Sequence, residues 1–253
     1  MRGLRAIICC WCLSSSFCAP LWSATSDYLE PKLLNGSIYD KPDGRLLFTF
    51  RRTATQTGDV VYVLREFRDP DGALAAQERV QYERGRLVRF ELDEKQIGAS
   101  GYALVKPIDN QRQQINFQYT GRPSQGAKTR QKVETVRDEV LISDTLPGFL
   151  ADHWDELSRG AAPRFRFIVV PRQETIGFKV SRESTTEFHG RKAVRIKMEP
   201  VSWIISKALE PLIFTVEAEP PHRVLQYWGR TTPRVPVGDA LREVEVLSVF
   251  DWQ

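Results

Sequence analysis

Apolar and polar residues alternate with a period of two along most of the chain, and this pattern constrains the fold more than any other feature. In the runs 194–199 (VRIKME) and 88–92 (VRFEL), every second residue is apolar. Successive side chains of a β-strand point to opposite faces, so the pattern predicts strands with one face on a core and one in water. Strands of this kind form antiparallel sheets. We therefore predict a mainly β protein.

The same alternation marks eight further runs, and turn sequences lie between several of them. Pro-Asp-Gly occurs at 42–44 and 70–72, and the pairs Arg-Gly and His-Gly occur at 84–85 and 189–190. These residue types suit the backbone angles of tight turns, so we expect hairpin corners there. The eight runs are 46–51, 60–67, 115–119, 165–170, 176–182, 212–217, 224–228 and 244–250.

Two segments carry helical spacing instead. In 144–159 the apolar residues recur three or four positions apart, which predicts one amphipathic helix with Asp144 as its N-cap and Gly160 just past its end. A short apolar helical insert is predicted at 202–209, with Ser202 as its cap. Because this insert is apolar almost all round, we expect it to be buried or to cover another part of the protein.

The amino terminus resembles a signal peptide. Arg2 and Arg5 precede an apolar stretch, 6–22, that is shorter than a membrane-spanning helix requires. We expect cleavage after about residue 24 and no membrane span in the mature protein. All four cysteines lie at 9–18, so the mature chain would fold without disulfides.

Residues 25–253 are expected to form a single β-rich domain. The polar segment 121–131 is the best candidate for a linker, so two sub-regions joined there remain an alternative. The chain has 36 Lys and Arg against 32 Asp and Glu. These charges alternate along strands and do not form a basic cluster, so nucleic-acid binding is not expected.

The sequence offers little support for catalysis. His153 and Glu156 have the spacing of neighbours on a helix, but two side chains do not make a metal site. Glu217 and Glu219 would share one strand face, where charged pairs are common without catalytic roles. The chain has no nucleophile-elbow, phosphate-loop or dinucleotide-binding motif. We therefore expect no cofactor and no enzymatic activity.

The segment 165–230 is the most characteristic part of the chain. Two strands, RFRFIVV and TIGFKVSRES, precede the hairpin EFHGRKAVRIKMEP, the apolar insert VSWIISKALEP and the strands LIFTVEAEP and RVLQYWG. This order resembles uncharacterised secreted bacterial β-proteins and, more distantly, the half-barrel of the lipoprotein-localisation factors. The resemblance implies a curved antiparallel sheet or half-barrel around a helix, a periplasmic or secreted location, and a lipophilic ligand.

The function predicted from these features is binding in the bacterial envelope. One hypothesis is a lipophilic small molecule held on the concave side of the sheet, with the insert as a lid. The alternative is a structural protein, or one that binds another envelope protein, whose aromatic residues are ordinary core; a hydrolytic enzyme ranks below both. The candidate ligand-binding residues are Phe165, Phe167, Phe178, Val194, Ile196, Trp203, Ile205 and Phe214.

Overall fold

The computed structural model describes residues 28–41, 44–207, 209–238 and 240–252, so the predicted signal peptide lies outside the described residues. Strands dominate it, as predicted. They are β1 (Leu33–Asp40), β2 (Leu46–Thr57), β3 (Val60–Arg68), β4 (Leu74–Glu83), β5 (Arg86–Glu94), β6 (Ala99–Pro107), β7 (Gln113–Thr120), β8 (Thr129–Val136), β9 (Val140–Leu141), β10 (Arg164–Val169), β11 (Glu174–Phe188), β12 (Arg191–Pro200), β13 (Leu212–Glu217), β14 (Val224–Arg230), β15 (Val235–Val237), β16 (Ala240–Arg242) and β17 (Glu245–Asp251).

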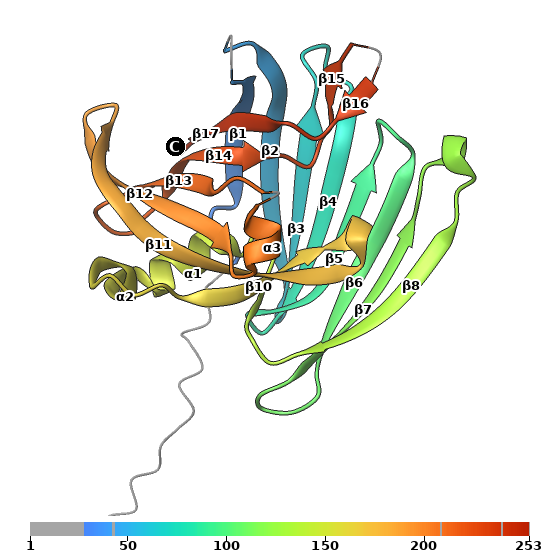
Figure 1. Cartoon of the computed structure of the whole chain (residues 1–253), viewed down its shortest axis with the longest axis horizontal. Coiled ribbons are helices and arrows are strands. Elements are labelled where there is room, and N and C mark those ends of the chain that lie inside the picture. Colours follow the sequence, from blue (N-terminus) through green and yellow to red (C-terminus); the bar gives the residue numbers. More distant parts are fainter. Residues whose placement is uncertain (1–27, 42–43, 208, 239, 253) are drawn as a thin grey trace, which may run out of the picture.

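Fifteen of these strands form one curved sheet (Figure 1). Its order is β8-β7-β6-β5-β4-β3-β2-β1-β17-β14-β13-β12-β11-β10-β9, and the sheet does not close on itself. The last strand, β17, lies between β1 and β14 and so joins the first half of the sheet to the second. A separate small hairpin consists of β15 and β16.

The sheet departs from the purely antiparallel prediction at one edge, where β9 and β10 are parallel. Two helices, α1 (Leu146–Asp152) and α2 (Trp154–Ser158), connect these strands. A helical crossover of this kind returns the chain in its original direction, which is why the two strands run parallel. The other short helices are α3 (Trp203–Ser206) and the 3₁₀ turns η1 (Pro123–Gln125) and η2 (Val170–Arg172).

The single helix predicted at 144–159 is interrupted at His153, which ends α1 and precedes α2. With this interruption, Trp154 stacks on His222 from the β13–β14 turn, with ring centroids 4.0 Å apart. Asp144 is not the N-cap; Thr145 occupies that position. Of the five apolar residues whose spacing predicted the helix, Trp154 is partly buried against the core, and the other four are buried: Leu146, Phe149, Leu150 and Leu157.

The hairpin corners at 70–72, 84–85 and 189–190 confirm three of the turn predictions, and residues 42 and 43 of the remaining one lie outside the described residues. Arg84 and Gly85 join β4 to β5, and His189 and Gly190 join β11 to β12, all with positive φ angles. Two successive positive φ angles are the geometry of the tightest hairpin turns. The polar segment 121–131 joins β7 to β8, which pair directly, and its last three residues already belong to β8.

Apolar side chains gather into three clusters along the sheet. One lies over β3–β7, a second lies between β10–β14 and helices α1 and α2, and a third joins β1, β2, β3, β4 and β17. Among the residues that the structure describes, no helix has the length and apolar character needed to cross a membrane. The second cluster contains most of the residues predicted to bind a ligand.

Candidate functional site

Seven of the eight predicted ligand-binding residues lie in or against one apolar core. Five are buried, each at most 6% exposed, and Phe167 and Ile205 pack against the same cluster with partial exposure. Trp203 is 66% exposed. The five buried residues are Phe165, Phe178, Val194, Ile196 and Phe214.

Helices α1 and α2 supply the other side of this core. Leu150 and Leu157 are almost completely buried in the same cluster. The Phe149 ring meets Phe165 edge to face, with centroids 4.9 Å apart, and Phe165 stacks on Phe178 at 6.2 Å. The predicted ligand-binding side chains therefore contact one another and the two helices.

The insert around α3 differs from its prediction, because much of its apolar surface faces solvent. Val201, Trp203 and Ile204 are 45, 66 and 64% exposed, and we call these three residues the apolar tip. The helix has only four residues, too few to turn all of its apolar side chains toward the sheet. Ile205 contacts the second cluster, and the Lys207 ammonium lies 4.5 Å from the centre of the Trp203 ring.

The apolar tip concentrates exposed apolar surface in a way that the rest of the described chain does not. The other large exposed apolar residues are far apart in the sequence and lie singly on different elements, which is ordinary for a protein surface. A contiguous exposed apolar patch, in contrast, often marks a contact site. The scattered residues are Leu33, Tyr62, Ile108, Val133 and Val237.

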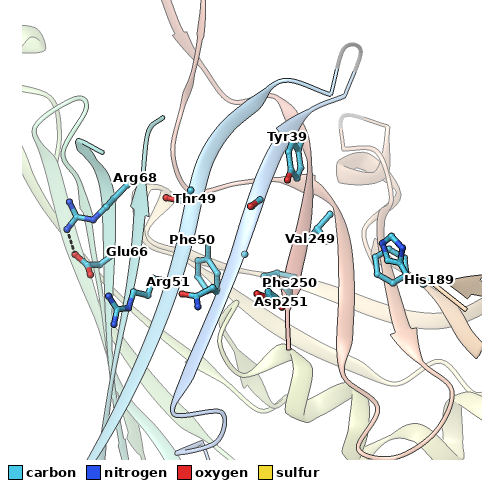
Figure 2. Close-up of a pocket in the computed structure, with 14 residues that line it drawn as sticks. Tyr39, Thr49, Phe50, Arg51, Glu66, Arg68, His189, Val249, Phe250 and Asp251 are labelled. Carbon is cyan, nitrogen blue, oxygen red and sulfur yellow. Dashed lines mark hydrogen bonds and ion pairs between the residues drawn. The ribbon is translucent and has the colours of Figure 1, made fainter. Parts of the chain in front are cut away.

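A groove of about 680 Å³ lies elsewhere, on the outer face of β1, β2, β3 and β17 (Figure 2). Its floor consists mainly of side chains that alternate with core residues along these strands. Phe188 and His189, at the tip of the β11–β12 hairpin, line its side. The charged and aromatic side chains of the floor include Tyr39, Arg51, Glu66, Arg68 and Asp251.

The charges on the groove floor balance. Arg68 donates a hydrogen bond to Glu66, with a distance of 2.8 Å between Nη2 and Oε1. Arg51 and Asp251 are exposed, and neither side chain makes a hydrogen bond or ion pair with any residue that the structure describes. The floor thus offers one free guanidinium and one free carboxylate to a ligand.

A buried layer of charged residues, which the sequence did not predict, separates two of the apolar clusters. Arg52, Arg65 and Glu78 are neighbours on the inner face of β2, β3 and β4. Arg52 Nε lies 2.7 Å from Asp144 Oδ1, and Arg65 Nη1 lies 2.5 Å from Glu78 Oε2. The Tyr82 hydroxyl donates to Asp144 at 2.7 Å. Two cations and two carboxylates are therefore paired within the fold.

Further hydrogen bonds connect this buried charged layer to distant parts of the chain. The Ser143 hydroxyl lies within hydrogen-bonding distance of Arg65, and the Thr232 hydroxyl donates to Glu78 at 2.5 Å. Arg52 also donates to the carbonyl oxygens of Tyr28, at 2.6 Å, and Pro31. The layer is enclosed, and its charged groups are paired with one another, although Arg65 Nε is buried without a hydrogen-bond partner. Its role is to hold these segments together.

The electrostatics of Asp144 follow from its neighbours. Burial alone would raise the pKa of the Asp144 carboxyl. The charge of Arg52 and the hydrogen bonds from Arg52 and Tyr82 together outweigh burial, so the pKa of Asp144 lies below its ordinary value. Burial and the same carboxylate raise the pKa of the Tyr82 phenol, which therefore remains a hydrogen-bond donor.

A pH dependence of stability follows from this depressed pKa. Ionised Asp144 stabilises the fold above the unfolded pKa of aspartate, about 3.9, and the stabilisation is lost as pH falls through the lower folded pKa. The difference in unfolding free energy between wild type and Asp144→Asn should therefore narrow as the pH falls below about 4. Urea unfolding of both proteins between about pH 7 and pH 2 measures this difference in free energy. A difference that stays constant over this range would contradict the lowered pKa of Asp144.

The histidine and glutamate candidates are in ordinary surface contacts. His153 Nδ1 lies 3.2 Å from Glu156 Oε1 at the end of the helices, and Glu217 pairs with Arg191 at 2.8 Å. Within the described ranges, no three His, Cys, Asp or Glu side chains are grouped in a way that could hold a metal ion.

The chain matches no family model, no curated protein and no solved structure at a significant level. Its function is therefore inferred from its own residues and their geometry. Two surfaces, the apolar tip and the groove, have chemistry that the fold itself does not use.

Proposed function

We propose that this is an exported lipid-binding protein of the bacterial envelope, and that the apolar tip makes the contact with lipid. The observation that carries the proposal is the exposure of Trp203 and Ile204, which is 66 and 64% on a helix of four residues. Two observations support a location in the bacterial envelope. The amino terminus has two arginines followed by an apolar stretch, as in a signal peptide, and residues 165–230 resemble secreted bacterial β-proteins.

The residue types of the apolar tip suit the boundary between water and lipid. Indole combines a large apolar surface with one N–H donor, and for this reason tryptophan is enriched where one end of a side chain is wet and the other apolar. Lysine can lay its aliphatic stem along an apolar surface while its ammonium stays in water. In the structure the Lys207 ammonium lies over the Trp203 ring, 4.5 Å from its centre, so a positive charge sits beside the apolar tip.

The expected affinity is modest. Complete burial of a large apolar side chain contributes roughly 1.5–3 kcal/mol. Three side chains that are about half to two-thirds exposed would thus contribute about 3–5 kcal/mol, which corresponds to a dissociation constant on the order of 1 mM. The protein should therefore touch lipid reversibly and should not be permanently anchored by the tip.

Polar replacement of the apolar tip should weaken lipid binding without unfolding the protein. The variant Trp203→Ser/Ile204→Ser should bind vesicles at least about tenfold more weakly, because it loses more than roughly 1.4 kcal/mol of apolar contact. Its free energy of unfolding should change by less than about 1 kcal/mol, since both side chains are exposed. Co-flotation with phosphatidylcholine vesicles, with and without phosphatidylglycerol, measures the binding.

The matched control is Tyr62→Ser/Val133→Ser, which removes exposed apolar side chains from β3 and β8. This variant should float with vesicles as the wild type does. If the wild type floats with neither kind of vesicle, lipid is the wrong occupant and the tip is better explained as a contact for another envelope protein. If the tip variant floats as well as the wild type, the contact lies elsewhere.

A further inference from the structure

We propose that the groove on β1, β2, β3 and β17 binds a neutral oligosaccharide. This site is separate from the apolar tip, and the inference does not depend on lipid binding. The groove has a volume of about 680 Å³, within the range of about 300–1,000 Å³ that is usual for small-ligand sites. Unlike those mostly apolar sites, its floor is an open polar sheet face (Figure 2).

The balance of charge on the floor favours a ligand that has no net charge. The floor carries two guanidinium groups, Arg51 and Arg68, and two carboxylates, Glu66 and Asp251, so it offers no net charge to attract an anion or a cation. Hydroxyl groups can both donate and accept hydrogen bonds. A polyhydroxylated ligand can therefore accept from the free guanidinium of Arg51 and donate to the free carboxylate of Asp251.

The spacing of these two groups sets the length of the ligand. Asn35 pairs with Arg51 on one side and with Asp251 on the other, so the three residues form a row across β2, β1 and β17. Neighbouring strands lie about 4.8 Å apart, which places the Cα atoms of Arg51 and Asp251 about 10 Å from each other along the row. A ligand of two linked sugar rings is long enough to lie along this row and contact both side chains.

Aromatic side chains around this row provide the surface on which sugar rings can pack. Tyr39 lies on the floor, and Phe188 and His189 line the side, with their rings 4.3 Å apart in an edge arrangement. The flat apolar face of such a ring suits the C–H face of a sugar. Asn35 and Ser37 add polar groups between the aromatic side chains and the charged pair.

The test is binding of the full chain to an array of neutral oligosaccharides, followed by titration with the best-bound sugar. Wild type should bind at least one sugar of two or more rings, and Arg51→Ala/Asp251→Ala should weaken that binding at least tenfold. Both side chains are exposed and unpartnered among the described residues, so the variant should fold normally. The control Asp59→Ala/Arg84→Ala, which removes an exposed ion pair at a distant turn, should bind as wild type does.

The remaining outcomes decide against the proposal. If no neutral oligosaccharide binds, if only acidic sugars or inorganic phosphate bind, or if the Arg51→Ala/Asp251→Ala variant binds as well as wild type, the groove is not this site. The variant Trp203→Ser/Ile204→Ser should keep its sugar binding in full. The lipid proposal and the oligosaccharide proposal can therefore fail separately.

Discussion

Replacing Asp144 by asparagine should lower the free energy of unfolding by about 3–5 kcal/mol, the usual cost of removing one partner of a buried ion pair. The Arg52 and Asp144 side chains are only 6 and 2% exposed. Without the carboxylate, Arg52 would keep its charge in the interior with only carbonyl oxygens as partners. Urea unfolding at neutral pH measures this loss of unfolding free energy. The dependence of the free energy on urea concentration should be the same for both proteins.

An exposed ion pair provides the control for this substitution. Asp59 and Arg84 lie 3.4 Å apart at the turns beside β3 and β5, and both side chains are exposed. Asp59→Asn should cost less than about 1 kcal/mol because water solvates both groups. If Asp144→Asn costs no more than Asp59→Asn, the buried charged layer does not hold the fold together as the structure indicates.

Phe165→Ala should also cost about 3–5 kcal/mol, because it removes a large buried ring and leaves a cavity. Phe165 is 1% exposed and contacts Phe149 on α1 and Phe178 on β11. Thermal or urea unfolding of the purified, delipidated protein gives the value. The absence of lipid in this measurement matters, since the contacts of Phe165 are made by the protein itself.

The control is Tyr62→Ala, which removes an exposed ring from β3 and should change the free energy of unfolding by less than about 1 kcal/mol. A similarly small loss for Phe165→Ala would contradict the packed core beneath α1 and α2. It would instead favour the hypothesis that Phe165 and its neighbours form the wall of a lipophilic ligand site.

The alternation of apolar residues predicted ten strands with one buried and one wet face, but it missed β4 and β6, whose buried faces include alanines and, in β4, Glu78. All ten runs identified in this way overlap strands of the structure. β8 was missed because nearly all of its residues are exposed on both faces, so it has no alternation to detect. β1 was missed because its residues, LLNGSIYD, do not alternate regularly between apolar and polar types.

The packing around Gly36 explains why glycine lies within a strand. Phe50 on β2 and Phe250 on β17 are both paired with Gly36, and their rings meet edge to face with centroids 5.7 Å apart. A Cβ atom at Gly36 would lie 2.8 Å from the carbonyl oxygen of Val249 and 3.2 Å from the Phe250 ring. Such contacts depend on strands far apart in the sequence, which a local pattern cannot reveal.

The buried charged layer and the functional surfaces also depend on contacts between distant parts of the chain, which a local sequence pattern cannot reveal. Arg52, Arg65 and Glu78 occupy inward positions of their strands, where a charged residue looks like a break in the pattern unless its partners are known. The insert at 202–209 was located correctly, but its apolar composition suggested burial, whereas Trp203 and Ile204 are exposed. The groove joins residues from β1, β2, β3, β17 and a distant hairpin, so only the folded chain shows it.

The most direct measurement of lipid contact is the quenching of Trp203 fluorescence by brominated phosphatidylcholine. The difference between the spectra of wild type and Trp203→Phe isolates this residue from the other tryptophans of the chain. With saturating vesicles, Trp203 should be quenched most strongly by lipids brominated near the headgroup, because a short tip reaches only the interfacial region. If brominated and ordinary vesicles give the same Trp203 emission, the apolar tip does not enter lipid and the proposed function is wrong.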